Sequence, residues 1–132
     1  MANHITGLKL TTVTRGIRTD IGGIYLLKVN FNAVNLPGGG IAGVKKYKIK
    51  CAIARSKFSV SRNVTNFTTL AEKTQNISIG DVAVAEPFEF KFTVSNLFHG
   101  SALKRGVYFA VVTVSERKGL LEMKMSNFID LD

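Results

Sequence analysis

A strict alternation of apolar and polar side chains is the feature that most constrains what this chain can fold into. In residues 25–33, YLLKVNFNA, every odd position is apolar, and Lys28, Asn30 and Asn32 stand between them. Residues 88–95, FEFKFTVS, repeat the pattern with three phenylalanines. A period of two puts alternate side chains on opposite faces of a strand, whereas a helix would scatter those phenylalanines around its axis. Both stretches are predicted to be strands with one buried face.

Three further stretches are also predicted to be strands. Residues 106–115, GVYFAVVTVS, are apolar on both faces, which predicts a central strand covered on both sides or a strand packed against a partner. Residues 116–119, ERKG, then form a tight turn into an alternating stretch at 120–128, so a β-hairpin is expected. Residues 46–54 alternate between lysine or alanine and larger apolar side chains, which predicts another strand.

The predicted fold class is all-β, an antiparallel β-sandwich of about seven or eight strands, immunoglobulin-like or jelly-roll-like. A partly open barrel is the alternative. Helix is expected to be scarce, with two turns at most in residues 66–74, NFTTLAEKT. Because 132 residues suit one core, we expect a single domain over 1–132. Residues 1–20 alternate weakly and are expected to form an edge strand or a mobile arm.

The glycine-rich stretch at 36–50, LPGGGIAGVKKYKIK, resembles a phosphate-binding loop only superficially. That loop needs Gly, four residues, then Gly-Lys-Ser/Thr, and it leads into a helix. Gly38 and Gly43 have the right spacing, but Val44 stands where the lysine belongs, and an alternating strand follows. A turn with positive φ angles at glycine is therefore the better interpretation.

Positive charge is concentrated in one segment of the chain. The formal net charge is +9; residues 1–44 contribute +3, residues 45–62 contribute +7, and residues 63–132 contribute −1. No carboxylate occurs between Asp20 and Glu72. Such a field favours an acidic partner, either nucleic acid, an acidic protein or an anionic surface, although a merely solvated face is the alternative.

The basic strand is the candidate contact for such a partner. Lys46, Lys48 and Lys50 are predicted on one face, ~6.6 Å apart. The candidate site for an acidic partner or nucleic acid is Lys46, Lys48, Lys50, Arg55, Lys57 and Arg62. Such a row can follow a phosphate backbone. Against this, sheets that bind nucleic acid add exposed aromatic side chains for base stacking, and edge strands carry lysines simply to block edge-to-edge aggregation.

Signals for chemistry are weak. Cys51, the only cysteine, occupies an apolar strand position and reads as a buried structural thiol. The two histidines, His4 and His99, and Cys51 show no metal-ligand spacing, and no catalytic motif is recognisable. We therefore expect no catalytic, metal or cofactor-binding residues and no cofactor. The sequence shows no signal peptide and no membrane span, so a cytoplasmic or virion location is expected.

These observations predict a basic, non-catalytic structural or interaction protein, not an enzyme. It would be a subunit of a larger oligomeric assembly such as a virus or phage particle, and its partners would be other protein subunits. The alternative is a nucleic-acid-binding β domain that uses the basic strand. In both cases the glycine-rich residues 36–43 would form a turn that leads into the basic strand, and not a ligand site.

Overall fold

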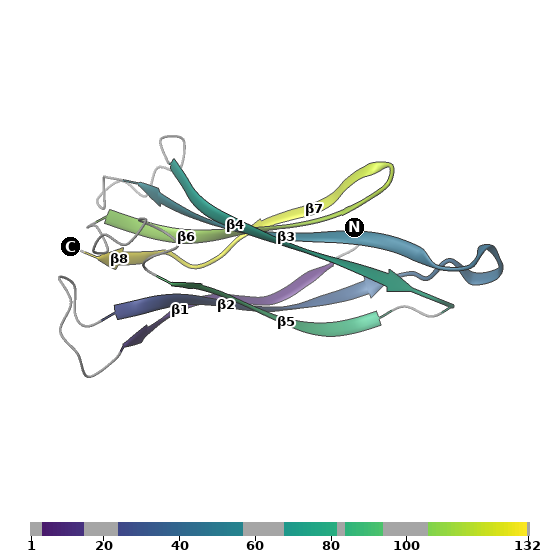
Figure 1. The fold of residues 1–132 in the computed structure, drawn as a ribbon, viewed down its shortest axis with the longest axis horizontal. Helices are drawn as coiled ribbons and strands as arrows, with labels where there is room; N and C mark the ends of the chain where they lie inside the picture. The colour runs from purple at the N-terminus through teal and green to yellow at the C-terminus, as the bar shows by residue number, and fades with distance from the viewer. Residues whose placement is uncertain (1–3, 15–23, 57–67, 82–83, 94–105, 132) are drawn as a thin grey trace.

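The computed structural model describes residues 4–14, 24–56, 68–81, 84–93 and 106–131 of the chain. Two antiparallel sheets lie face to face with the core between them (Figure 1). The strands are β1 (Ile5–Thr14), β2 (Ile24–Leu36), β3 (Lys45–Ser56), β4 (Thr68–Ile79), β5 (Val84–Thr93), β6 (Gly106–Glu116), β7 (Gly119–Met125) and β8 (Ile129–Leu131). The predicted antiparallel β-sandwich with little helix is confirmed.

The strand order identifies which kind of sandwich this is. The first sheet has the order β1-β2-β5, and the second has the order β4-β3-β6-β7, with β8 also pairing with β6. An immunoglobulin constant-type sandwich places its first, second, fifth and fourth strands in one sheet. Here the fourth strand pairs with the third instead. Of the two forms predicted, the immunoglobulin-like one is observed, with the fourth strand moved to the second sheet.

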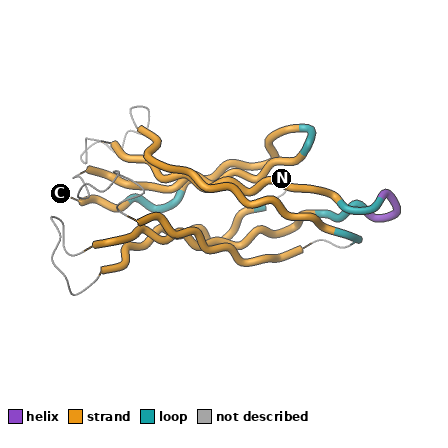
Figure 2. The backbone as a smooth tube through the Cα atoms, in the orientation of Figure 1, coloured by secondary structure: helices purple, strands orange, loops and turns teal. Residues whose placement is uncertain are grey.

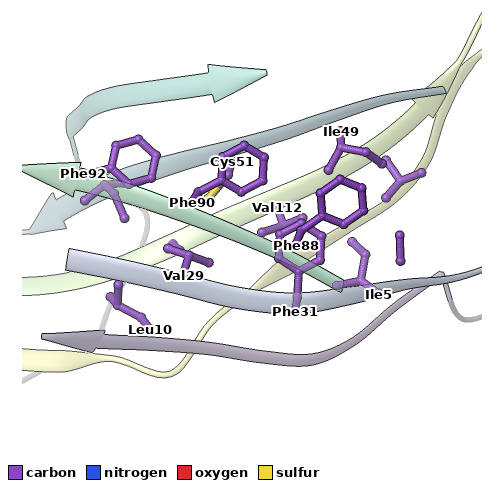
Figure 3. Packing of buried hydrophobic residues seen from close by; sticks show 14 of the residues in the cluster. Ile5, Leu10, Val29, Phe31, Ile49, Cys51, Phe88, Phe90, Phe92 and Val112 are labelled. Atoms are coloured by element: carbon purple, nitrogen blue, oxygen red, sulfur yellow. The ribbon is translucent and has the colours of Figure 1, made fainter. Parts of the chain in front are cut away.

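Strand alternation builds the core as the sequence predicts. Val29 and Phe31 on β2, Phe90 on β5 and Cys51 on β3 all point inward between the sheets (Figure 3). The Phe31 ring stacks on the ring of Phe88 with centroids 5.3 Å apart, and Phe88 and Phe31 are cross-strand partners. Stacked aromatic pairs add to the free energy gained by burial alone. The core is thus carried by the faces that the alternation identifies.

Polar contacts join the two sheets along the side where β1 and β7 lie. The side-chain amide of Asn127 accepts from Leu10 N at 2.8 Å and donates to Leu10 O at 3.0 Å, as a neighbouring strand would. The Lys124 ammonium donates to Ile5 O at 2.9 Å. β1, which covers Ile5–Thr14 of the N-terminal residues, is an edge strand of the first sheet.

The glycine-rich stretch connects the two sheets. After β2, a single 3₁₀ turn at Gly40–Ala42 leads into β3, and Figure 2 shows this turn in purple at one end of the sandwich. Gly40 has a φ of 59° and Gly43 a φ of 106°. Glycine reaches these conformations without the steric cost that a Cβ imposes. The prediction of a positive-φ turn feeding a strand is confirmed.

One prediction of local structure is wrong. Residues 66–74 were expected to form up to two helical turns, but the described part of them, from Thr68 onward, belongs to β4. β4 pairs with β3 in an antiparallel ladder from Arg55 to Lys45. It is an edge strand exposed on both faces for most of its length, so no apolar alternation marks it in the sequence. Pairing with β3 outweighs the local helix preference of Leu, Ala, Glu and Lys.

Candidate binding face on the second sheet

Lys46, Lys48 and Lys50 lie side by side on the outer face of the second sheet, and we call this surface the basic face. Their neighbours in sequence, Tyr47 and Ile49, point into the core. β3 pairs with β4 on one side and with β6 on the other. The interpretation of these lysines as guards of a free strand edge is therefore wrong, because the strand has no free edge. Their charge needs another explanation.

Small polar side chains flank the lysines on both neighbouring strands. Lys48 lies between Asn76 on β4 and Ser115 on β6. Lys50 lies in the same way between Thr74 and Thr113. Hydroxyl and amide groups donate hydrogen bonds without adding negative charge. The basic face therefore offers several donors to an acidic ligand.

Little of the positive charge on the basic face is neutralised. Lys50 Nζ lies 3.9 Å from a carboxylate oxygen of Glu72, and both side chains are about half exposed, at 42% and 54%. An ion pair this exposed contributes little. Within the described part of the chain, no ion pair joins Lys46 or Lys48 to a carboxylate. The basic face therefore keeps a net positive charge in solution.

A hollow opens where β3 and β4 extend past the β6–β7 turn. Its volume is about 900 Å³, and its lining contains Lys45, Lys46, Lys48, Arg117 and Lys118 against one carboxylate, Glu116. The hairpin of β6 and β7 curves away from the rest of the second sheet at this end (Figure 1). Convergent cations in a concave surface raise the local concentration of anions. The hollow therefore continues the positive field of the basic face.

One cation of the hollow already has a fixed partner. Lys45 Nζ lies 3.0 Å from a Glu116 oxygen, and this hydrogen bond raises the pKa of Lys45. The same ammonium lies 5.8 Å from the centre of the Tyr47 ring. The Tyr47 hydroxyl donates to Pro37 O at 2.5 Å, and burial raises the pKa of this phenol. Tyr47 thus ties the glycine-rich stretch to the sheet, and Lys45 is paired with Glu116.

An apolar strip borders the basic face. Leu120, Leu121, Met123 and Met125 on β7 are all exposed, and Leu120 and Met123 each reach 60% exposure. Met123 is the cross-strand partner of Thr113, which in turn pairs with Lys50. Exposed apolar side chains beside a charged surface are typical of protein interfaces, in which methionine is enriched.

Of the other three predicted contact residues, the structure describes only Arg55, and Arg55 does not join the row. Arg55 follows Lys50 by an odd number of residues on a regular strand, so it points to the opposite face, beside Gly106. Lys57 and Arg62 lie outside the described residues. Conversely, sequence reasoning missed Lys45, Arg117 and Lys118. Arg117 and Lys118 are visible in the sequence as a basic pair in the predicted turn at 116–119. Only the pairing of β3 with β6 brings that turn close to Lys46.

Among the described residues, Cys51 and His4 have surroundings that fix them within the fold. Cys51 is fully buried, and desolvation raises the pKa of its thiol to about 12, which confirms the buried thiol. His4 Nδ1 lies 3.2 Å from Val34 O, and it is the backbone N of His4, not its ring, that donates to the Glu122 carboxylate. His99 lies outside the described residues. Among those that are described, no cluster of three or more His, Cys, Asp or Glu could hold a metal ion.

The described residues contain no helix with the length and hydropathy needed to cross a membrane. No protein-family model matches the chain, and no curated protein matches it in sequence.

Solved structures resemble the fold. Part of a calcium-binding mutant of Bacteroides uniformis β-glucuronidase 2 matches with a TM-score of 0.55 and 14% identity, over 95% of this chain. A covalent complex of that enzyme with cyclophellitol-6-carboxylate aziridine, and a further Bacteroides uniformis β-glucuronidase structure, match at TM-scores of 0.49 with 13% and 15% identity over 95% of this chain. This chain spans only 13% of the length of each. At such identities the first likeness shows a β-sandwich fold and gives this chain no activity.

Proposed function

We propose that this protein is a non-catalytic interaction subunit that docks an acidic protein surface through the basic face. The observation that carries the proposal is the position of Lys46, Lys48 and Lys50. They stand on the solvent side of a fully paired strand, and exposed Glu72 is their single close carboxylate among the described residues. A row of charged side chains that protects no edge, and in which the only close carboxylate among the described residues is exposed, suits an external ligand.

The surroundings of the row favour a protein as the partner. The apolar strip on β7 lies two strands away from the lysines on the same face. A protein partner could bury these side chains while its carboxylates contact the lysines. A nucleic acid would gain little from Met123 or Leu120. We therefore place acidic protein partners first.

The assembly would be built from several protein subunits. A virus or phage particle is the concrete form that we propose, because a compact, basic β-sandwich with no recognisable catalytic group suits a building block. The solved structures support the modular part of this proposal only by fold, since a sandwich of this kind forms a small part of a much longer chain.

Nucleic-acid binding is the second candidate, and the spacing of the lysines favours it. Alternate residues of a strand lie ~6.6 Å apart, so the row can follow a phosphate backbone. Against it, the described part of the basic face offers no exposed aromatic side chain, because Tyr47 is 2% exposed and points into the core. Base stacking supplies much of the affinity for single strands.

Binding measured at two salt concentrations separates the two candidates. The purified protein is titrated into labelled single-stranded DNA, duplex DNA and poly-glutamate, and light scattering follows the particle size. Our proposal predicts that the protein binds poly-glutamate, and that it binds nucleic acid of equal charge no more tightly. It also predicts that light scattering shows a larger particle when a protein partner is present. DNA binding that is at least about ten-fold tighter than poly-glutamate binding, and that is lost in Lys46/Lys48/Lys50→Ala, would instead establish the second candidate.

A further inference from the structure

The sandwich has four strand edges in its described part, and three of them carry features that prevent pairing with another chain. β1 contains a bulge at Gly7, whose φ is 64°, followed by Lys9. β5 contains Pro87, which has no N–H to donate, and Lys91. β4 carries the charges of Glu72 and Lys73. Bulges, prolines and charges are the usual protections of an edge strand.

The fourth edge, β7, also carries charges, Glu122 and Lys124, and its ladder with β6 shifts register next to Glu122, but its exposed side chains are mostly apolar. Four of the six large apolar side chains that are exposed in the described residues lie on this strand: Leu120, Leu121, Met123 and Met125. The strand contains no proline. An exposed apolar edge strand is a template for pairing with another strand. The question is which strand it suits.

The backbone of β7 is oriented for such pairing. Ser126 N donates to Ala110 O at 2.9 Å, so the N–H of Ser126 points toward β6. In an antiparallel ladder the direction of the backbone groups alternates along a strand. Lys124 and Glu122 therefore also direct their backbone groups toward β6. Met123 and Met125 direct theirs away from β6, to the open edge.

The sequence of β7 is complementary to itself in the antiparallel direction. When two copies meet with Met123 opposite Met123, Glu122 of each lies opposite Lys124 of the other, and Leu121 lies opposite Met125. Two opposite-charge pairs and three apolar pairs result, because Met123 also meets Met123, and the outward N–H and C=O of Met123 pair across the twofold axis. Cross-strand pairs of these kinds stabilise a sheet. We infer that β7 pairs with β7 of a second copy of this chain and joins two second sheets into one.

This arrangement is compatible with the contacts that Glu122 and Lys124 make within one copy. Lys124 Nζ has three N–H donors, and the structure shows one of them on Ile5 O. Glu122 accepts from His4 N through Oε1. These contacts hold both side chains at the β7 edge, at the positions where the second copy presents the opposite charge. A symmetric contact of this type closes as a dimer and does not grow into a fibre.

The inference goes beyond the proposed function, because β7 would pair whether or not the lysines of the basic face bind an acidic partner. Experiments can also refute the proposed function and this inference independently of each other. Loss of poly-glutamate binding in a lysine variant leaves the oligomeric state unaffected, and a monomeric protein can still bind poly-glutamate.

Sedimentation equilibrium of the full chain over a concentration series tests the inference. The unmodified protein is expected to dimerise. Lys124→Glu and Glu122→Lys each place like charges opposite one another twice, so each alone should raise the dimer dissociation constant about ten-fold or more. An equimolar mixture of the two variants restores both opposite-charge pairs, and it should form a heterodimer. Circular dichroism shows that each variant is folded.

Two further variants complete the test. Met123→Pro removes an N–H that faces the open edge without removing a bond to β6, so it should give a folded monomer. Lys91→Glu makes the same charge change as Lys124→Glu, but on β5, and it should leave the dimer intact. The inference is overturned if the unmodified protein is monomeric throughout, if the mixed variants do not associate, or if Lys91→Glu dissociates the dimer equally.

Discussion

Cys51 directly follows Lys50 in the sequence but lies among apolar side chains in the fold. Alternation alone places it on the core side of β3, and the structure confirms this. The burial that protects the thiol also raises its pKa to about 12, with a smaller opposing effect from Lys73. A thiol in this setting stays protonated and unreactive at neutral pH.

The raised pKa of Cys51 predicts a loss of stability in alkali. The folded state holds the thiol proton more tightly than the unfolded state, so this contribution is complete below pH 9.0 and is lost as pH rises toward about 12. The free energy of unfolding, measured with urea from about pH 8 to about pH 11, should fall by up to about 1.4 kcal/mol per pH unit more steeply than in Cys51→Ala.

Comparison with Cys51→Ala isolates the thiol, because Lys45 and Tyr47 are present in both proteins and also have raised pKa values. Equal slopes in the two proteins would show that Cys51 does not titrate differently on unfolding.

The role of a single residue cannot be predicted from the sequence when that role depends on which strands lie next to it. Alternation correctly puts Lys46, Lys48 and Lys50 on the face opposite Tyr47. Alternation also places Arg55 on the opposite face, but grouping residues by charge alone puts Arg55 with the lysines. The role of edge guard was wrong for a related reason, since pairing partners are a property of the fold and not of the strand.

At the scale of elements, the strands with one buried face could be predicted from the sequence. β2, β3, β5, β6 and the turn before β7 all follow from the alternation and the turn residues. β4 could not, because an edge strand exposed on both faces has no apolar period to detect. The function of the glycine turn as a link between sheets also became clear only from the structure.

Close contact between the glycine turn and the end of β4 gives a test at this scale. A Cβ added to Gly38 would lie 1.7 Å from Gly80 O, whereas a Cβ on Gly80 would meet nothing within 4 Å. Gly38→Ala should therefore lower the free energy of unfolding by about 1–3 kcal/mol. Gly80→Ala should change it by less than about 0.5 kcal/mol.

Urea denaturation of the two variants measures the difference. The pair is matched, since each change adds one methyl group to one of two glycines that lie next to each other, and only the methyl group on Gly38 points into the contact. Equal stability of Gly38→Ala and Gly80→Ala would mean that the turn does not pack against β4 as described.

For the whole molecule, the sequence predicted the class of fold and the segment that carries the charge. It did not predict which strands are neighbours, and the candidate site depends on that. Pairing of β3 with β6 adds Arg117 and Lys118 to the surface of Lys46 and Lys48. The same order of strands makes β7 an edge and leaves its apolar side chains beside the basic face.

The central claim is that the basic face, and not the net charge of the protein, binds an acidic protein surface. Two variants of equal net charge test it: Lys46/Lys48/Lys50→Ser on the basic face, and Lys9/Lys73/Lys91→Ser on the strands β1, β4 and β5. The measurement is the dissociation constant for labelled poly-glutamate at physiological ionic strength. Our account predicts about ten-fold weaker binding for the first variant and near-normal binding for the second. Equal loss in both, or no loss in the first, would contradict it.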